Sequence, residues 1–259
     1  MRYIKGFYMA LGMFCAIPLP FHLWDKKLTA IMVVSFPLVG VVIGAIWWAA
    51  ALLLTSFNFP LMLGAAILTV TPFFIAGFIH LDGYMDTSDA RLSYRPLEDR
   101  LRILKDPNVG AFAVVMLVIL ILTQFAAVYT ILESGRFLAL LITICVISRC
   151  CSSLSIFILR HLSISNYSAM LGQNIGTGNR IFVILILLVT IALSYLYAGF
   201  FGLIVSAAVV LGYGAAIRIV YKDFNGISGD LLGYALVIAE VCGLIALALL
   251  QGLEINIWF

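Results

Sequence analysis

Long apolar runs alternate with short polar stretches along this chain, and most of the runs match the length of a membrane-spanning helix. A helix of about 20 apolar residues crosses the hydrocarbon core of a bilayer. We expect spans at about residues 31–55, 61–80, 109–132, 137–159, 181–198, 200–220 and 231–250. Residues 3–20 are apolar but short and interrupted by Gly and Pro, which favours a re-entrant or interfacial segment. The pattern therefore predicts an all-α fold, a polytopic membrane bundle of about seven helices.

The composition supports this class of protein. Hydrophobic residues make up 64% of the 259 residues and charged residues only 10%, whereas ordinary soluble domains carry about 25% charged residues. We expect a single membrane-embedded domain over residues 1–259, without a cleavable signal peptide. The five cysteines lie in or beside apolar runs and form no C-x-x-C pair, which argues against zinc or redox chemistry.

The basic residues determine the expected orientation in the membrane. With the N-terminus in the cytosol, thirteen of the fifteen Lys and Arg residues fall on the cytosolic side, Arg136 lies outside and Arg149 lies within a span. The three longer polar loops, 81–108, 160–180 and 221–230, then all emerge in the cytosol. Transporters usually place binding groups near the bilayer midplane in two related halves, and we find no internal repeat. The layout therefore favours an enzyme that takes soluble substrates from the cytosol.

Half of the acidic residues lie in one stretch, residues 80–106, which holds six of the twelve. Asp82, Asp86 and Asp89 follow an i, i+4, i+7 spacing that places them on one face of a helix. Such carboxylates repel one another unless a cation lies between them, and a hard divalent ion shared with a phosphate meets that need. A solvated acidic helix start is the alternative. Gly83 either permits close approach of a ligand to the backbone or marks a kink where the span ends.

Arg149 is expected near the middle of a span, where a guanidinium is costly and needs a partner. Several serines surround it in the sequence, which favours a side chain that faces a water-filled cavity over a buried structural ion pair. Glu240 lies about ten residues inside the last span and is costly there for the same reason. We therefore expect Arg149 and Glu240 to pair.

Two polar segments have a functional and a plain interpretation. The arginines within residues 91–102 alternate with acidic residues, as in a phosphate-binding segment or in a charged amphipathic helix at the membrane interface. The glycines and amides of the 160–180 loop suit a lid or a phosphate-cradling turn, and equally an ordinary loop.

Two further polar positions adjoin expected spans. Asp106 before Pro107 indicates a helix end, with Lys105 and Asn108 able to face the same site as the acidic residues. Asp230 lies at the start of the last span, where it can cap the helix or belong to the site.

Four stretches carry motifs in a fixed order: FPLVGVVIG at 36–44, HLDGYMDTSD at 80–89, LKDPNVGAF at 104–112, and SGDLLG at 228–233 with Glu240 after it. In these motifs and their spacing, the chain resembles the cobalamin synthase (adenosylcobinamide-GDP ribazoletransferase) family over nearly its whole length. The chain departs from the family pattern at Ala90-Arg91-Leu92, Pro107, Ala113 and Ser228. These departures bear on the shape of the loops and leave the three aspartates in place.

The resemblance implies a late step of cobalamin biosynthesis, catalysed at the cytoplasmic (inner) membrane of a prokaryote with the active site facing the cytosol. The ribose hydroxyl of α-ribazole, or of its 5′-phosphate, attacks the phosphorus nearest the cobinamide in adenosylcobinamide-GDP, and GMP leaves. Mg²⁺ is the implied cofactor, because its charge offsets that of the diphosphate. The implied partners are these two substrates and membrane lipid, without nucleic acid; a homo-oligomer and a complex with other corrin-pathway enzymes both stay open.

The resemblance also implies roles for individual residues. Asp82, Asp86 and Asp89 are expected to be catalytic and to bind the metal, directly or through water. The alternative role for Asp86 or Asp89 is that of the base that deprotonates the attacking hydroxyl. The expected substrate-binding residues are His80, Arg91, Lys105, Asn108, Arg149, Asp230 and Glu240. The basic residues of this set are candidates for phosphate contacts, and Asp230 for a second acidic group across the site.

Two other functions fit parts of the sequence. A CDP-alcohol phosphatidyltransferase also uses acidic residues at helical spacing, but its pattern has wider intervals between Asp-Gly, Ala-Arg and a second aspartate pair. Here Ala90-Arg91 follows Asp89 directly, and no second pair lies at the required distance. A cation transporter could use acidic residues together with Arg149 and Glu240 as a relay, although the acidic cluster lies on one side of the expected bundle.

Overall fold

In the computed structural model of the chain, residues 1–162 and 176–257 are described, and their regular elements are all helices. An isolated bridge between His161 and Ile227 is the only β-type pairing in these two ranges. The elements are α1 (Arg2–Phe14), the 3-10 helix η1 (Lys26–Leu28), α2 (Thr29–Val34), α3 (Phe36–Ser56), α4 (Leu61–Ile75), α5 (Ile79–Leu92), α6 (Leu97–Ile103), α7 (Ala111–Ser134), α8 (Leu140–Ile158), α10 (Thr177–Ala198), α11 (Phe200–Phe224) and α12 (Gly229–Ile257). The predicted all-α fold is confirmed.

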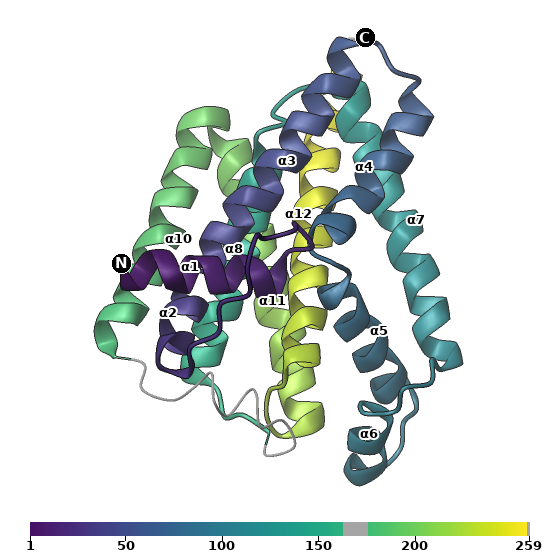
Figure 1. Ribbon diagram of the computed structural model, residues 1–259. Helices are drawn as coiled ribbons and strands as arrows, with labels where there is room; N and C mark the ends of the chain where they lie inside the picture. Colours follow the sequence, from purple (N-terminus) through teal and green to yellow (C-terminus); the bar gives the residue numbers. More distant parts are fainter. Residues whose placement is uncertain (163–175, 258–259) are drawn as a thin grey trace.

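Six of the described helices are long and apolar enough to cross a membrane: α3, α7, α8, α10, α11 and the part of α12 that ends at Gly252. They run lengthwise through the molecule in Figure 1. α8 and α12 form the centre of the bundle, since 78% of the span is buried in each of them, against 11% in α10. α4 and α5 together supply a seventh candidate span, bent by 93°. The predicted bundle of about seven helices is confirmed.

Glycines allow the first long helix to approach the centre closely. Gly40 and Gly44, one helical turn apart on α3, both face α8. A Cβ atom on Gly40 would lie 2.6 Å from the carbonyl oxygen of Cys145, and one on Gly44 would lie 2.6 Å from the Cα of Ile142. Small residues at such contacts are typical of membrane helices, which associate through close backbone packing. The motif at 36–44 therefore serves the contact between α3 and α8.

The span expected at 61–80 is not a continuous helix. α4 ends at Ile75, and the next residues include Gly77 and Phe78 in left-handed backbone conformations, with φ of 65° and 62°. The chain turns by 93° between α4 and α5. The span expected at 61–80 is thus broken after Ile75, because left-handed residues interrupt a right-handed helix. The turn gives the acidic helix α5 a direction of its own (Figure 1).

The N-terminal segment forms α1, which is 13 residues long and runs across the long helices in Figure 1. At 1.5 Å per residue, this helix is too short to cross a bilayer. It packs closely on the segment before α3, because a Cβ atom on Gly6 would lie 2.5 Å from the side chain of Ile31. The structure thus agrees with the expectation that this segment is not a full span.

Candidate active site

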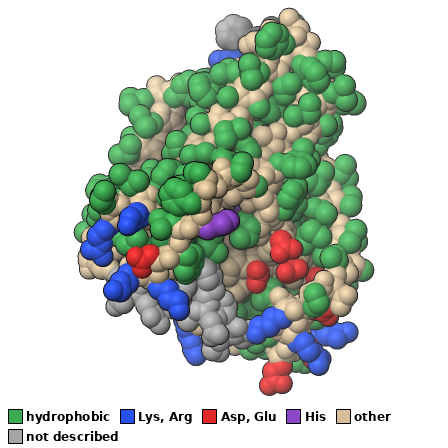
Figure 2. All heavy atoms as spheres, in the orientation of Figure 1, with side chains coloured by type: hydrophobic (Ala, Val, Ile, Leu, Met, Phe, Trp, Pro, Cys, Tyr) green, Lys and Arg blue, Asp and Glu red, His purple; other side chains and the backbone are tan. Residues whose placement is uncertain are grey.

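Three carboxylates lie along one face of α5, as the spacing predicted. Asp82 is exposed, and Asp86 and Asp89 are half-buried on the two following turns. Figure 2 shows acidic side chains gathered at the lower right of the molecule, where α5 lies in Figure 1. Basic side chains lie along the lower part of this face, and hydrophobic ones cover most of the upper part. The acidic face of α5 is therefore open to ligands on the charged end of the bundle.

Asp230 joins this face because α5 and α12 touch backbone to backbone. A Cβ atom on Gly83 would lie 2.8 Å from the Cα of Asp230, and one on Gly233 would lie 3.2 Å from the carbonyl oxygen of His80. Gly83 lies inside α5, so it does not mark the kink where the preceding helix ends. Its lack of a side chain allows the start of α12, with Asp230, to reach α5.

The four carboxylates interact with one another. Asp86 lies within electrostatic range of Asp82, Asp89 and Asp230, and Asp230 lies within range of Asp82. Within residues 1–162 and 176–257, none of the four is in an ion pair with Lys or Arg. No three His, Cys, Asp or Glu side chains in the same ranges converge on one point as a ready-made metal site. The arrangement is a cluster of mutually repelling carboxylates, which a cationic ligand would stabilise.

The loop before α7 closes over one end of this cluster. A Cβ atom on Gly110 would lie 2.0 Å from each carboxylate oxygen of Asp89, so the carboxylate packs directly against the Cα of Gly110. The backbone of Gly110 is extended, a conformation open to any residue. Glycine is therefore needed here for space. This contact joins the motif at 104–112 to the motif at 80–89.

Gly110→Ala is expected to push the Asp89 carboxylate out of the cluster while leaving the fold intact, because the atoms in the way are the end of a flexible side chain. Misplacement of a catalytic group by about 1 Å can cost about 100-fold in rate. We expect kcat to fall by about tenfold to 100-fold, as measured by product release from the purified protein.

The matched control is Gly214→Ala on α11, where a Cβ atom meets nothing within 4 Å; its activity should equal that of the unmodified chain. In an Asp89→Ala background, Gly110→Ala should have no further effect, since the two changes act on one group. Additive losses would contradict this interpretation.

Lys105 and Asn108 lie in the exposed loop between α6 and α7. Asn108 donates two hydrogen bonds to Oδ1 of Asp106, from its backbone amide at 2.9 Å and from its side-chain amide at 2.7 Å. These two bonds lower the pKa of Asp106, which keeps its carboxylate ionised and the turn closed. The predicted helix end before Pro107 is confirmed, because α6 ends at Ile103. The Lys105 side chain is exposed in this loop, the same loop whose Gly110 packs on Asp89.

Arg91 and His80 belong to α5 but occupy other surroundings than the three aspartates. Arg91 follows Asp82 by about two and a half helical turns, on the opposite face, and its Nε donates to Oδ2 of Asp223 at 2.7 Å. His80 is 9% exposed and lies beside the paired rings of Phe14 and Phe36, with centroid distances of 6.2 and 5.7 Å. The substrate contacts expected from Arg91 and His80 stay predictions.

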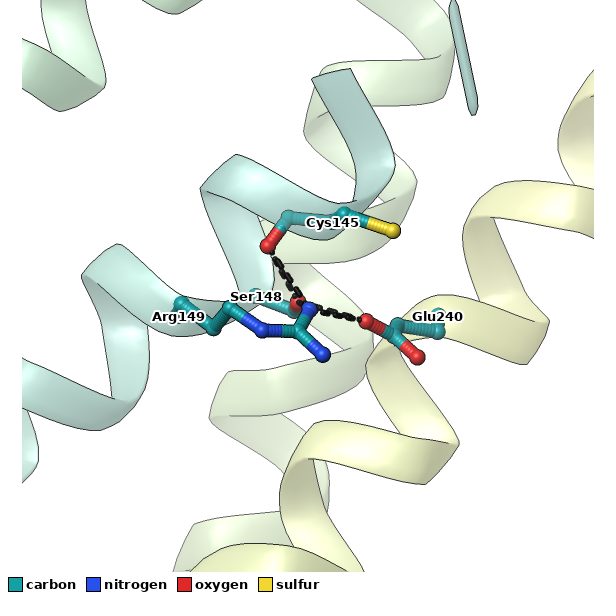
Figure 3. A network of polar contacts seen from close by, with 4 residues as sticks. All are labelled: Cys145, Ser148, Arg149 and Glu240. Atoms are coloured by element: carbon teal, nitrogen blue, oxygen red, sulfur yellow. Dashed lines mark hydrogen bonds and ion pairs between the residues drawn. The ribbon is translucent and has the colours of Figure 1, made fainter. Parts of the chain in front are cut away.

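Arg149 and Glu240 pair in the centre of the bundle, as predicted (Figure 3). Nη1 of Arg149 donates to a carboxylate oxygen of Glu240 at 2.5 Å and to the carbonyl oxygen of Cys145 at 2.9 Å. The hydroxyl of Ser148 donates to the same Glu240 oxygen at 3.0 Å. Arg149 is 1% exposed and Glu240 7%. The expected water-filled cavity beside Arg149 is therefore wrong, and the substrate-binding roles of the pair stay predictions.

The 160–180 loop begins beside the segment that leads to Asp230. The amide of Ile227 donates to the carbonyl of Arg160 at 2.9 Å, and the amide of Leu162 donates to the carbonyl of Ile227 at the same distance. The lid or phosphate-cradling turn expected in this loop falls mainly on residues 163–175, which lie outside the described residues.

Comparison with known proteins gives this arrangement a family. The family model described as CobS, cobalamin-5-phosphate synthase, matches residues 6–248. The chain belongs to the CobS family. The adenosylcobinamide-GDP ribazoletransferase of Clostridium perfringens (strain ATCC 13124) is 35% identical over 248 residues, which cover 96% of this chain and 99% of the relative.

Other relatives of the same name extend the match. That of Clostridium botulinum (strain Alaska E43) is 34% identical, covering 95% of this chain and 97% of the relative. That of Geobacillus kaustophilus is 30% identical, covering 98% and 94%. No solved structure matches the chain.

CobS membership confirms the resemblance seen in the motifs, all four of which lie within the matched residues. It makes the chain a multi-pass membrane transferase of cobalamin biosynthesis. The phosphatidyltransferase and transporter alternatives lose their support, because the family model and the relatives extend over nearly the whole chain.

Two contacts that build the site in this CobS-family chain were not predicted from its sequence. One is the packing of Gly110 on Asp89, and the other is the ion pair of Arg91 with Asp223. The glycine belongs to a motif that the sequence did show, so its presence was a usable signal. Asp223 lies 132 residues from Arg91 in the chain, and no spacing rule connects two residues so far apart.

Proposed function

We propose that this chain transfers the cobinamide-phosphate group of adenosylcobinamide-GDP to α-ribazole, or to its 5′-phosphate, and releases GMP. The activity is that of the CobS family. The location of the reaction rests on the cluster of four carboxylates, Asp82, Asp86 and Asp89 on α5 and Asp230 on α12. The backbone contact of Gly83 with Asp230 brings the two helices together, and the four groups interact electrostatically at the charged end of the bundle. A diphosphate has to be bound there together with cations, because both partners are anionic.

The donor atoms of this cluster fit Mg²⁺. All four side chains offer hard oxygen ligands, and Mg²⁺ is usually held by one or two carboxylates together with waters and substrate phosphates. A complete protein cage is not needed for such binding, which agrees with the absence of a three-ligand group in the described part of the chain. We assign Asp82, Asp86 and Asp89 as the residues that would hold the ion, with Asp230 opposite them. Bound there, Mg²⁺ would supply positive charge against the diphosphate oxygens.

The side chains of the site are assigned to the proton transfer and to the contact with the departing phosphate. Asp86 or Asp89 takes the proton from the attacking ribose hydroxyl. The hydroxyl oxygen then bonds to the phosphorus nearest the cobinamide, and the bond from that phosphorus to the bridging oxygen breaks, so that GMP leaves with the bridging oxygen. Lys105 is exposed in the same loop as Gly110, which packs on Asp89, and is the cation that we assign to the departing phosphate.

The site is proposed to face the cytosol of a prokaryotic cell. This orientation rests on the Lys and Arg residues, which concentrate in the segments that adjoin the acidic cluster. Nucleotide substrates occur in the cytosol, so the same orientation gives them direct access.

Removal of divalent cations is expected to stop the reaction. Purified protein in detergent, supplied with both substrates, should release GMP with Mg²⁺ present and lose at least about 100-fold in rate with EDTA, since a metal supplies several kcal/mol of charge stabilisation. Added Mg²⁺ should restore the rate. GMP release that continues unchanged in EDTA would overturn the metal assignment, and a chain without GMP release under any condition would overturn the activity.

A further inference from the structure

Asp223 lies where three segments of the candidate active site meet. It is the second-last residue of α11, just before Asn225, whose left-handed backbone (φ 59°) turns the chain toward Asp230. Its carboxylate contacts α5, which carries the three aspartates, and α6, which leads into the loop of Lys105 and Gly110. None of the sequence motifs contains this residue.

The contacts of Asp223 are made by its two oxygens separately. Oδ2 accepts from Nε of Arg91 at 2.7 Å, and Oδ1 lies 3.8 Å from Nη1 of Arg100. The guanidinium of Arg100 also lies over the ring of Phe224, with 5.4 Å to the centroid. One carboxylate thus ties α5 and α6 to the end of α11, and a cation–π contact supports the second tie.

The partial burial of this cluster separates it from an ordinary surface ion pair. The side chains of Arg91 and Asp223 are each 32% exposed and that of Arg100 is 19% exposed. In the pair of Arg102 with Asp99 on α6, 77% of the arginine side chain and 36% of the aspartate side chain are exposed, so this pair is closer to the surface kind. Exposed pairs of that kind contribute little, so Asp99 offers a matched control.

We propose that Asp223 is a positioning residue for the reaction. It holds α5 and α6 against α11, so that the carboxylates of α5 stay opposite Asp230 and the loop with Gly110 stays over Asp89. It also keeps Arg91 and Arg100 engaged away from the acidic cluster, which these guanidinium groups would otherwise be attracted to. The inference rests on the proposed function only for its kinetic consequence, because the tie between the helices is independent of the reaction.

Asp223→Asn tests this with two measurements. Steady-state GMP release should show kcat lowered by about tenfold to 100-fold, since small displacements of catalytic groups cost rates of this order, with KM for adenosylcobinamide-GDP changed much less. Limited trypsin digestion, followed by mass spectrometry, should show faster cleavage after Arg100, because in the unmodified chain Asp223 holds this arginine against α11. Asp223→Glu, which can rebuild the pair, should recover most of kcat and of the protection. Asp99→Asn should match the unmodified chain in GMP release.

Arg100→Gln keeps the test decisive if Asp223→Asn does not fold. This variant removes only the 3.8 Å contact and should lower kcat by a smaller factor, about twofold to fivefold, with faster cleavage after Arg102 as the digestion readout. Unchanged kcat and an unchanged digestion pattern in the folded variants would overturn the inference. An equal loss in Asp99→Asn would also overturn it. Failure of the proposed function would instead appear as missing GMP release in the unmodified chain, and the digestion result would still decide the tie.

Discussion

Asp86→Asn is expected to lower kcat for GMP release by about 100- to 1,000-fold, the usual loss when one preorganised electrostatic group is removed. Asp86 is the carboxylate that interacts with all three others of the cluster. The substitution removes a proposed metal ligand and one of the two candidate bases and keeps the shape of the side chain. It should act on the rate more strongly than any change at the rim of the site.

The same substitution is expected to leave the fold at least as stable as before when Mg²⁺ is absent. Asp86 is repelled by Asp82, Asp89 and Asp230, so the loss of its charge relieves repulsion in the folded chain. Thermal unfolding in detergent with EDTA should therefore show an equal or higher melting temperature. This combination of lost activity and retained stability is typical of residues that serve function at the expense of stability.

Asp99→Asn provides the control for Asp86→Asn, because it makes the same chemical change at a half-buried aspartate of α6 whose partner, Arg102, is exposed. Its activity and its melting temperature should both stay close to those of the unmodified chain. If Asp86→Asn kept more than about a tenth of the activity, the two roles assigned to this carboxylate would be wrong. A lower melting temperature in EDTA would show that Asp86 has a favourable partner in the folded chain.

The local parts of the site were predictable from the sequence. The i, i+4, i+7 spacing placed the three aspartates on one face, and α5 is a helix over that stretch. The pairing of Arg149 with Glu240 was predictable for another reason. Two opposite charges inside apolar spans have few partners other than each other, and the structure joins them. The sequence also favoured a water-filled cavity beside Arg149, and only the packing of α8 against α12 shows that the pair is buried instead.

The parts that the sequence did not predict depend on how distant segments pack. The break at Gly77 and Phe78 lies inside an apolar run, where hydropathy alone cannot distinguish a straight helix from a bent one. The contact of Gly110 with Asp89 and that of Arg91 with Asp223 follow from the crossing of α5 with its neighbours. Such contacts have no periodicity of their own, so a single sequence gives no measure of them.

Removing one charge of the buried pair between α8 and α12 is expected to cost more stability than removing both. Glu240→Met leaves the Arg149 guanidinium, which is 1% exposed, without its carboxylate. Breaking such a pair usually costs about 3–5 kcal/mol, whereas replacing both charges by apolar residues of similar size is often neutral. Arg149→Met should likewise be destabilising. The double variant Arg149→Met with Glu240→Met should unfold closer to the unmodified chain than either single variant.

Unfolding measurements and activity on the same four proteins then separate the two roles predicted for this pair. If the pair is structural, the double variant should regain both stability and GMP release, because α8 and α12 again pack correctly around the site. If Arg149 or Glu240 also contacts the substrate, stability should return while activity stays low. Double-variant cycles isolate this coupling, since the interaction is the only term that the two single changes share. A double variant less stable than both single variants would mean that Arg149 and Glu240 each stabilise the fold through groups other than the partner charge. The pair would then belong to a larger polar network that includes Ser148.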